Sequence, residues 1–272
     1  MSTQKKSTND IVIVDVGCRW GFADTWMELL PQARIYGFDP DIDECERLRL
    51  RYNDPNIILV PQALAETSGL HTLYLTQNLA CSSLYQPISE LTSAVTELEC
   101  ATKVDTTKVE VTTLDLWSTL AGVDRIDFIK LDTQGSELDI LRGGVGILQT
   151  IRVIEIEVEF NPIYENQPLF GDVDKFLREQ GFELWRLSNM VHYSRKDSNH
   201  QYQASDVSYY DSKPMQHPTL GGQLYWGHAH YIRKKIINGE SFNDQQQCAR
   251  DAVILKKLGF DDLAFRLSSN KN

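Results

Sequence analysis

The chain of 272 residues is 42% hydrophobic and carries a formal net charge of -11. No apolar run approaches the roughly 20 residues of a transmembrane helix, and the acidic balance disfavours nucleic-acid binding, which depends on Lys and Arg. The five scattered cysteines form no CxxC pair, which disfavours a zinc site or a disulfide framework. We therefore expect a cytoplasmic protein with reduced thiols that contacts neither membranes nor nucleic acids.

The N-terminal half alternates apolar strands with amphipathic helices. It follows a short tail, residues 1–10, which has no hydrophobic segment and is not expected to act as a secretory signal. Strands are predicted at 11–16, 34–38 and 56–60, and helices at 22–30 and 41–52. This rhythm predicts an α/β fold with a doubly wound parallel sheet and right-handed crossovers.

Residues 78–108 interrupt this rhythm. They are rich in Ser and Thr, contain a predicted helix at 88–99, and are the expected lid or acceptor-recognition insertion. Further strands are predicted at 71–76, 109–113, 126–131, 151–160, 182–187 and 224–232. Further helices are predicted at 114–120, 136–148, 172–180 and 243–258, with 194–222 irregular. We expect one domain over 11–232 and a C-terminal helical extension over 233–272, whose helix packs on the sheet or forms a homodimer contact.

The first predicted strand runs into the sequence Asp15-Val16-Gly17-Cys18-Arg19-Trp20-Gly21. The Gly-x-x-x-Gly spacing of Gly17 and Gly21 differs from the Gly-x-Gly-x-x-Gly loop that cradles a diphosphate, which disfavours NAD and FAD. The carboxylate of Asp15 would repel a phosphate but can accept a hydrogen bond from an amino group. Gly17 allows the chain to turn closely under a ribose. The loop therefore favours a nucleoside with a methionine tail in place of phosphates.

Two further strand ends support a nucleoside site. Asp39 follows the second strand, where its carboxylate can accept from both hydroxyls of a ribose. Gln62 and Ala63 follow the third strand, where the Gln62 side chain or the Ala63 backbone would face an adenine edge. An Asp-Pro pair after a strand is also common in ordinary turns, so the prediction depends on the three strand ends together.

The sequence IDFIKLDTQGSELDILRGG, residues 126–144, closely resembles the signature of the FkbM-type methyltransferases. These S-adenosylmethionine-dependent enzymes often methylate hydroxyl oxygens of sugars and polyketides. The resemblance runs from about residue 11 to 187 and includes Phe38-Asp39-Pro40, Ala63-Leu64, Ser82-Ser83-Leu84 and Thr113-Leu114-Asp115. It implies a class I, Rossmann-like methyltransferase fold with a seven-stranded sheet whose last strand is antiparallel. It also implies S-adenosylmethionine bound at the C-terminal ends of the strands.

Within the signature, Lys130, Asp132, Gly135 and Glu137 match the family by position. This chain departs from the family at Gln134, where an acidic residue is usual. If that acid serves elsewhere as a base or a metal ligand, the role is lost or moved here.

Methyl transfer to a hydroxyl requires the nucleophile in line with the methyl group and a base or metal to take the proton. Asp132, at the end of the 126–131 strand and beside the expected methyl position, is the first candidate base and also a cofactor contact. The alternative for Asp132 is a cap on the helix that starts near Ser136. A divalent cation remains an alternative, but no metal site is predicted.

The predicted strand 151–160 carries three glutamates, Glu155, Glu157 and Glu159, on one face. A central parallel strand is normally apolar on both faces, so these carboxylates must meet water, cations or a polar site. Either this face is solvated or paired with Arg and Lys, or Glu157, with Glu159, lines the acceptor pocket.

Two other patterns are weighed against plainer interpretations. Asn161-Pro162-Ile163-Tyr164 resembles the Asn-Pro-Pro-Tyr motif of some N-methyltransferases, but it follows the fifth strand instead of the fourth, and its third residue differs. A turn is the preferred interpretation. His228 and His230 share a face of the predicted last strand and are either a base or metal pair or structural residues.

The leading hypothesis is an O-methyltransferase that acts on a small-molecule or glycan hydroxyl. Its candidate catalytic residues are Asp132, Glu157 and His228. Its candidate acceptor contacts are Ser83, Lys130, Glu137 and Glu159. The alternatives are an N-methyltransferase that uses residues 161–164, and a catalytically silent cofactor-binding or scaffold protein, which Gln134 makes conceivable.

Overall fold

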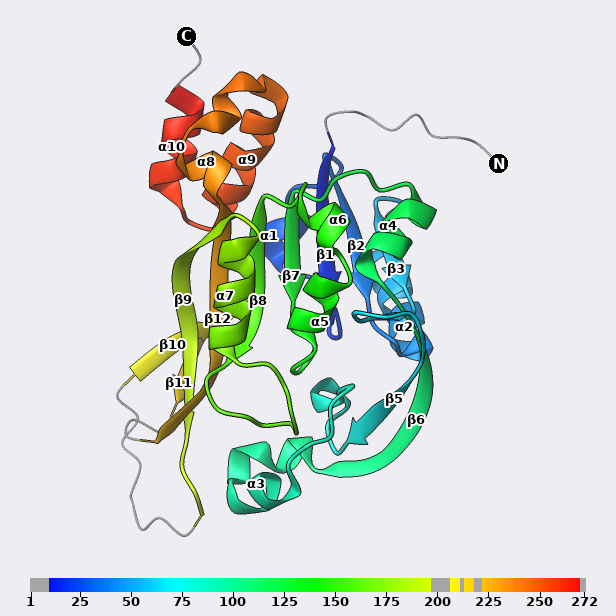
Figure 1. Cartoon of the computed structure of the whole chain (residues 1–272). Helices are drawn as coiled ribbons and strands as arrows, with labels where there is room; N and C mark the ends of the chain where they lie inside the picture. The colour runs from blue at the N-terminus through cyan, green and yellow to red at the C-terminus, as the bar shows by residue number, and fades with distance from the viewer. Residues whose placement is uncertain (1–9, 197–205, 211–212, 218–221, 270–272) are drawn as a thin grey trace.

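A computed structural model describes residues 10–196, 206–210, 213–217 and 222–269. Its main sheet has seven strands in the order β3-β2-β1-β7-β8-β12-β9 (Figure 1). The strands are β1 (Ile11–Val16), β2 (Ala33–Phe38), β3 (Ile57–Val60), β7 (Phe128–Leu131), β8 (Val153–Glu159), β9 (Phe182–Tyr193) and β12 (Gln223–Arg233). β12 runs antiparallel to both of its neighbours, and the other pairs are parallel. This confirms the predicted seven-stranded sheet with an antiparallel last strand.

Helices cover both faces of the sheet, which explains why β1 and β2 are largely apolar without alternation, whereas β8 carries glutamates on one face. One face packs against α4 (Leu114–Ala121), α5 (Glu137–Arg142), α6 (Val145–Leu148) and α7 (Phe170–Glu179). The other face packs against α1 (Asp24–Met27), α2 (Ile42–Tyr52), α8 (Lys234–Ile237), α9 (Gln245–Lys257) and α10 (Asp261–Ser269). None of the described helices combines the length and apolar character that a membrane span requires.

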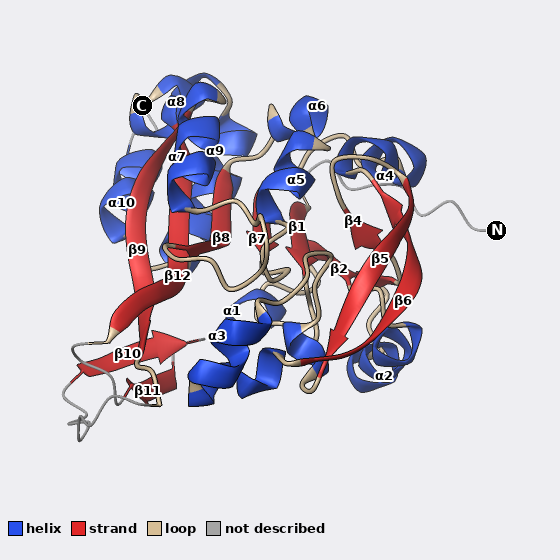
Figure 2. Cartoon of the chain, turned by 60° about the horizontal axis from the view of Figure 1, so that its bottom comes forward, coloured by secondary structure: helices blue, strands red, loops and turns tan. Residues whose placement is uncertain are grey.

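A second, smaller sheet flanks the predicted insertion at 78–108, beyond the carboxyl ends of the central strands (Figure 2). It pairs β4 (Ala63–Leu64) with β6 (Lys103–Thr112) in parallel and β5 (Gly69–Thr76) with β6 in antiparallel fashion. Between β5 and β6 lie η1 (Leu79–Cys81), α3 (Ser89–Ala94) and η2 (Thr96–Ala101). We call residues 69–112 the lid segment.

Several element predictions were wrong in extent. The helix predicted at 22–30 is only the single turn of α1, and the helix predicted at 88–99 divides into α3 and η2, because Val95 adopts extended backbone angles. The segment 194–222 contains two paired strands, β10 (Asp206–Tyr210) and β11 (Lys213–His217), and its remaining part at 197–205, 211–212 and 218–221 lies outside the described residues. Helix α10 was missed.

Helix α9 is attached to the amino ends of the central strands through buried charges. The Asp127 carboxylate accepts from the Val12 backbone at 2.9 Å and lies 3.2 Å from Nε of Arg250 in α9. Asp251, also in α9, binds Arg152 at 2.6 Å. Because Asp251 is fully buried, removing Arg152 would leave its charge without this cation, and breaking a buried pair in this way typically costs about 3–5 kcal/mol. The C-terminal helices are therefore part of the same packed body as β1.

Candidate active site

A cavity of about 1740 Å³ lies between the carboxyl ends of the main strands and the lid segment. Gly17, Asp39 and Asp132 line it from the main sheet, and Ser83 and Leu98 line it from the lid segment. Pockets for a single small ligand usually measure about 300–1,000 Å³. The cavity therefore has room for a nucleoside cofactor and a second molecule beside it.

The loop after β1 packs directly on the signature loop. Gly17 has a φ of 85°, and a Cβ at this position would lie 1.9 Å from the carbonyl oxygen of Asp132. The backbone N–H groups of Gly17 and Cys18 both donate to the Phe38 carbonyl at 3.0 Å. Only glycine allows this approach, so residue 17 fixes the spacing between the predicted cofactor loop and the predicted base.

The other residues of the predicted cofactor loop lie at different depths. Asp15 is buried in β1, between Gly37 and Lys130 in the sheet register, and is not among the residues that line the cavity. Gly21 lines the cavity with a φ of 110°, and a Cβ there would lie 2.1 Å from the Tyr52 hydroxyl.

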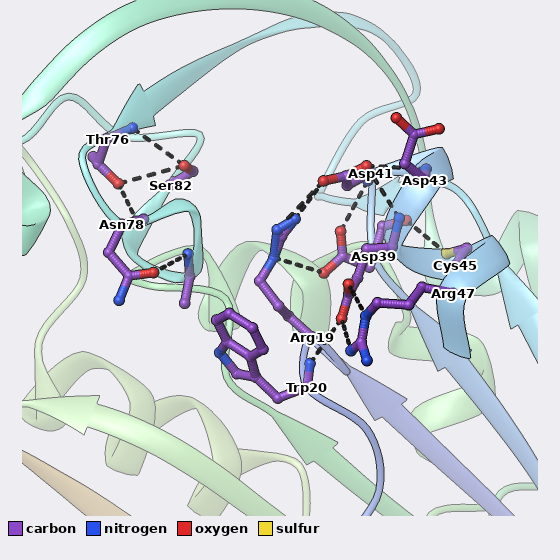
Figure 3. Close-up of polar contacts among 12 residues, drawn as sticks. Arg19, Trp20, Asp39, Asp41, Asp43, Cys45, Arg47, Thr76, Asn78 and Ser82 are labelled. Carbon is purple, nitrogen blue, oxygen red and sulfur yellow. Dashed lines mark hydrogen bonds and ion pairs between the residues drawn. The ribbon is translucent and has the colours of Figure 1, made fainter. Parts of the chain in front are cut away.

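Asp39 stands at the predicted ribose position, with only 5% of its surface exposed (Figure 3). Its Oδ1 accepts from the Asp41 backbone at 2.8 Å, and its Oδ2 lies 3.7 Å from Nε of Arg19, which also pairs with Asp41. Burial raises the pKa of Asp39, against the lowering effect of the Asp41 hydrogen bond and Arg19. Gln62 and Ala63 line the same cavity. The three strand ends therefore meet around one space.

The Asp132 carboxylate has a donor on each oxygen. Lys130 Nζ lies 3.1 Å from Oδ2, and the Gln134 side-chain amide lies 3.2 Å from Oδ1. Burial acts to raise the pKa of Asp132, but Lys130, His228 and Gln134 hold it below its ordinary value. Asp132 is therefore a carboxylate that stays ionised at neutral pH inside the cavity wall.

Gln134 joins four parts of the site. Its amide also donates to Glu157 Oε2 at 2.8 Å, and its side-chain oxygen lies 3.2 Å from the Tyr164 hydroxyl. Its backbone carbonyl accepts from the Ser83 hydroxyl at 2.7 Å, which ties the lid segment to the signature loop. Its φ of 63° places it in the left-handed region, which is unusual for a residue with a side chain.

Glu137 supports the signature loop from inside. Its carboxylate accepts from the backbone N–H groups of Thr133, at 2.5 Å, and Gly135, at 2.9 Å. It is buried and not among the residues that line the cavity, so this geometry does not match the expected acceptor contact. The expectation arose because position in the signature does not reveal on which side of the loop a side chain lies.

The glutamates of β8 differ in their surroundings, and Glu155 is half-buried. Glu157 and Glu159 are buried and line the cavity, and burial raises the pKa of both, as does the charge of Asp132. Glu155 lies 3.4 Å from Nδ1 of His228 and 3.3 Å from Nε2 of His230. His228 is buried and not among the lining residues, whereas His230 and Glu155 are.

The Asn161–Tyr164 segment is divided between two environments. The Asn161 amide donates to the Leu224 carbonyl at 2.7 Å and borders a separate hollow of about 290 Å³. Tyr164 is buried against the main cavity, where its hydroxyl donates to the Cys81 carbonyl at 2.8 Å. Asn161 therefore acts as a turn residue in this structure, and the geometry does not support its use to hold an amino acceptor.

The sequence interpretation assigned no role to several lining residues. Trp20 has a φ of 78°, a conformation that costs a bulky residue about 1–3 kcal/mol, and its side chain is exposed. The thiols of Cys81 and Cys100 lie 3.4 Å apart in the lid segment. No sequence pattern could have indicated the exposure of Trp20 or the pairing of the two thiols, because both depend on contacts between distant segments. Within the described ranges, no three His, Cys, Asp or Glu side chains are grouped to hold a metal ion.

Comparison with known proteins extends these observations. The Methyltransferase FkbM domain matches residues 15–184. A 2-O-methyltransferase, NoeI, of Sinorhizobium fredii (strain NBRC 101917 / NGR234) is 29% identical over 175 residues, which cover 61% of this chain and 70% of that protein.

Two solved structures are also similar to this chain. Magnesium protoporphyrin IX methyltransferase (ChlM) from Synechocystis PCC 6803, with bound SAM, has a TM-score of 0.37 at 11% identity, covering 82% of this chain and 70% of that one. Precorrin-6y C5,15-methyltransferase from Geobacter metallireducens GS-15 has a TM-score of 0.39 at 13% identity, covering 84% and 82%. The FkbM match spans more than half of the residues, with the β1 loop, Asp39 and the signature inside it, and the chain therefore belongs to the FkbM methyltransferase family.

Proposed function

We propose that this S-adenosylmethionine-dependent methyltransferase methylates a hydroxyl oxygen of a sugar, glycan or secondary metabolite. The observation that carries the proposal is the ionised carboxylate of Asp132, held by Lys130 and Gln134 in the wall of a cavity with room for two molecules. The similarity to NoeI, which is named a 2-O-methyltransferase, supports an oxygen acceptor.

The cofactor fits the residues at the β1–β2–β3 end of the cavity. The Asp39 carboxylate is buried, lines the cavity and would hold the two ribose hydroxyls. Gln62 or the Ala63 backbone would face the adenine. Gly17 and Gly21, which leave room for the Asp132 carbonyl and the Tyr52 hydroxyl, would shape the loop beneath the ribose. Asp15 is buried beneath this loop. We therefore propose that it shapes the turn and does not contact the cofactor directly.

When bound, S-adenosylmethionine would supply the electrophilic methyl group, with its sulfur as the leaving group. Asp132 takes the proton that the acceptor hydroxyl loses as its oxygen bonds to the methyl carbon. Each carboxylate oxygen has two lone-pair sites, so the donors on Asp132 leave capacity for this proton. Lys130 keeps the carboxylate ionised beforehand, and in-line positioning by the cavity walls supplies much of the remaining rate acceleration.

Glu157 and Glu159 have a different task from Asp132. Because burial and neighbouring charge raise the pKa of both, they hold protons under conditions in which Asp132 is ionised. A protonated carboxyl donates one hydrogen bond and accepts others. The cavity wall thus combines the charged Asp132, which accepts hydrogen bonds, with the neutral Glu157 and Glu159, which both donate and accept them. This combination suits a methyl acceptor with several neighbouring hydroxyls. His228 would support this wall from behind through its contact with Glu155.

The test is methyl transfer from labelled S-adenosylmethionine to a panel of monosaccharides, glycans, hydroxylated metabolites and amines, with products identified by mass spectrometry. Asp132→Asn should reduce turnover on a hydroxyl acceptor by about 100-fold or more, the range that a positioned base contributes. Calorimetry should show that this variant still binds S-adenosylmethionine.

Asp124→Asn, which alters an exposed carboxylate, serves as the matched control and should leave turnover unchanged. Full turnover by Asp132→Asn would show that Asp132 is not the base. Transfer confined to amines would overturn the oxygen acceptor.

A further inference from the structure

Trp20 presents its side chain to solvent inside the candidate active site. It is 64% exposed, whereas Trp26 and Trp117 are buried and Trp185 and Trp226 are half-buried. Its indole lines the same cavity as Asp39. In the view of Figure 3 the ring lies between the Asp39 carboxylate and the lid loop that carries Asn78 and Ser82. An exposed indole is a large apolar surface left without cover in the unliganded protein.

The backbone at Trp20 is held in its unfavourable conformation by helix α2. Its N–H donates to Glu44 Oε1 at 3.0 Å, and its carbonyl accepts from Arg51 Nη1 at 2.9 Å. Arg47 binds both oxygens of Glu44 and, together with the Trp20 N–H, lowers the pKa of that carboxyl to about 2. The Glu44 brace therefore stays charged across the physiological pH range.

The position next to Trp20 is confined by the same helix. Gly21 has no room for a Cβ because the Tyr52 hydroxyl occupies that space, and this hydroxyl accepts from the Phe22 backbone at 2.8 Å. Three side chains of α2 thus hold consecutive residues of one loop. Strained backbone persists only where the surroundings over-determine it, and it gathers at functional sites.

We propose that the indole of Trp20 packs against the adenosine half of bound S-adenosylmethionine and determines its affinity. Helix α2 starts directly after Asp39 and Asp41, so the element that braces Trp20 also adjoins the ribose position. The neighbouring Arg19 lies close to Asp39. Trp20 is therefore at the Asp39 end of the cavity and not at the Asp132 end. A flat π surface is the natural partner of an adenine ring.

The strain separates a binding role from a structural one. If Trp20 stabilised the fold, replacing it would lower the melting temperature. If Trp20 binds the cofactor instead, glycine at this position should have two effects. It should stabilise the fold, because glycine adopts a positive φ without strain, and it should weaken cofactor binding. Trp20→Gly should therefore raise the Tm of the unliganded protein by about 2–4 °C while its affinity for S-adenosylmethionine falls.

Calorimetry without any acceptor tests the proposal independently of the reaction. Trp20→Ala and Trp20→Gly should each raise the Kd about tenfold for both S-adenosylmethionine and S-adenosylhomocysteine, which share the adenosine. Trp20→Phe should retain most of the affinity. Leu50→Ala removes another exposed apolar side chain, on α2 outside the cavity, and should change neither Kd nor Tm.

Tryptophan fluorescence gives a second readout. Cofactor should quench the emission of the native protein, and Trp20→Phe should lose that change while calorimetry still detects binding. Unchanged Kd values for Trp20→Ala would overturn the proposal. A loss of affinity for S-adenosylmethionine alone would also overturn it, because the contact would then be with the sulfonium instead of the adenosine.

Discussion

Gln134 donates a hydrogen bond from its side-chain amide to Oε2 of Glu157 at 2.8 Å. The same amide lies 3.2 Å from Asp132, so a neutral group stands between the Asp132 and Glu157 carboxyl groups at the position where this family usually has an acid. A carboxylate there would repel the charge of Asp132 and remove the donor that favours its ionised form.

We predict that Gln134→Glu lowers kcat/KM about tenfold on the acid limb of the pH profile, corresponding to a shift of about one pKa unit, and changes it little at neutral pH. The sign follows from the present contacts. The amide and Lys130 lower the pKa of Asp132, so losing the amide raises it, and the ionised base then appears only at higher pH. The acid limb of the pH profile should move to higher pH. Gln149→Glu, on an exposed helix end, is the control, and an unmoved limb would contradict the interpretation.

Gly17→Ala should disturb the contact between the cofactor loop and the signature loop. The new methyl group would collide with the Asp132 carbonyl, and alanine would be strained at a φ of 85°, so we expect a loss of about 3 kcal/mol of folding free energy. Gly171→Ala, in α7 with open space around it, should be neutral or stabilising by about 0.5–1 kcal/mol. Chemical denaturation of both variants measures the difference, and equal stabilities would refute the close contact.

Asp39→Asn should weaken S-adenosylmethionine binding about tenfold, because hydrogen bonds to a charged group are the stronger ones. Burial raises the pKa of Asp39, so the native affinity should fall as the pH is lowered toward that raised pKa, and the variant should lack this dependence. A carboxyl whose folded pKa is raised opposes folding once ionised, so stability should not fall in Asp39→Asn at neutral pH. Calorimetry across pH, with melting curves, checks both effects.

Cys100 should be the most reactive thiol of the chain near neutral pH. A hydrogen bond from the Cys81 thiol lowers the pKa of Cys100 to about 7, whereas burial raises the pKa of Cys18 and Cys45. Iodoacetamide labelling followed by peptide mass spectrometry should therefore show a midpoint near 7 at Cys100. Cys81→Ala should move that midpoint up toward about 8.5. Preferential labelling of Cys18 would contradict this order.

The parts of the fold that follow from local patterns were predicted well. β1 agrees residue for residue with the predicted 11–16 strand, because a short apolar run bounded by an acid and a glycine has few other interpretations. Asp39, Gln62 and Asp132 meet at one cavity because the carboxyl ends of parallel strands share one edge of the sheet.

What could not be predicted depends on contacts between distant segments. The exposure of Trp20 is set by Glu44 and Arg51 of another element, and no periodicity encodes that. Glu137 and Asn161 are chemically suited to a site, but one is turned into its own loop and the other toward Leu224. Residue type indicates what a side chain can do, and only tertiary structure decides what it faces.

The buried bond between Asp127 and Arg250 also bears on how the protein is made. Asp127 precedes β7, at the base of the sheet, and its partner emerges from the ribosome more than a hundred residues later. Until α9 is synthesised, the apolar face that includes Ile13 and Phe128 lacks the cover of α9 and α10. Between the synthesis of β7 and that of α9, the nascent chain therefore carries an uncovered apolar sheet face, and the docking of α9 and α10 completes the packing on this side of the sheet.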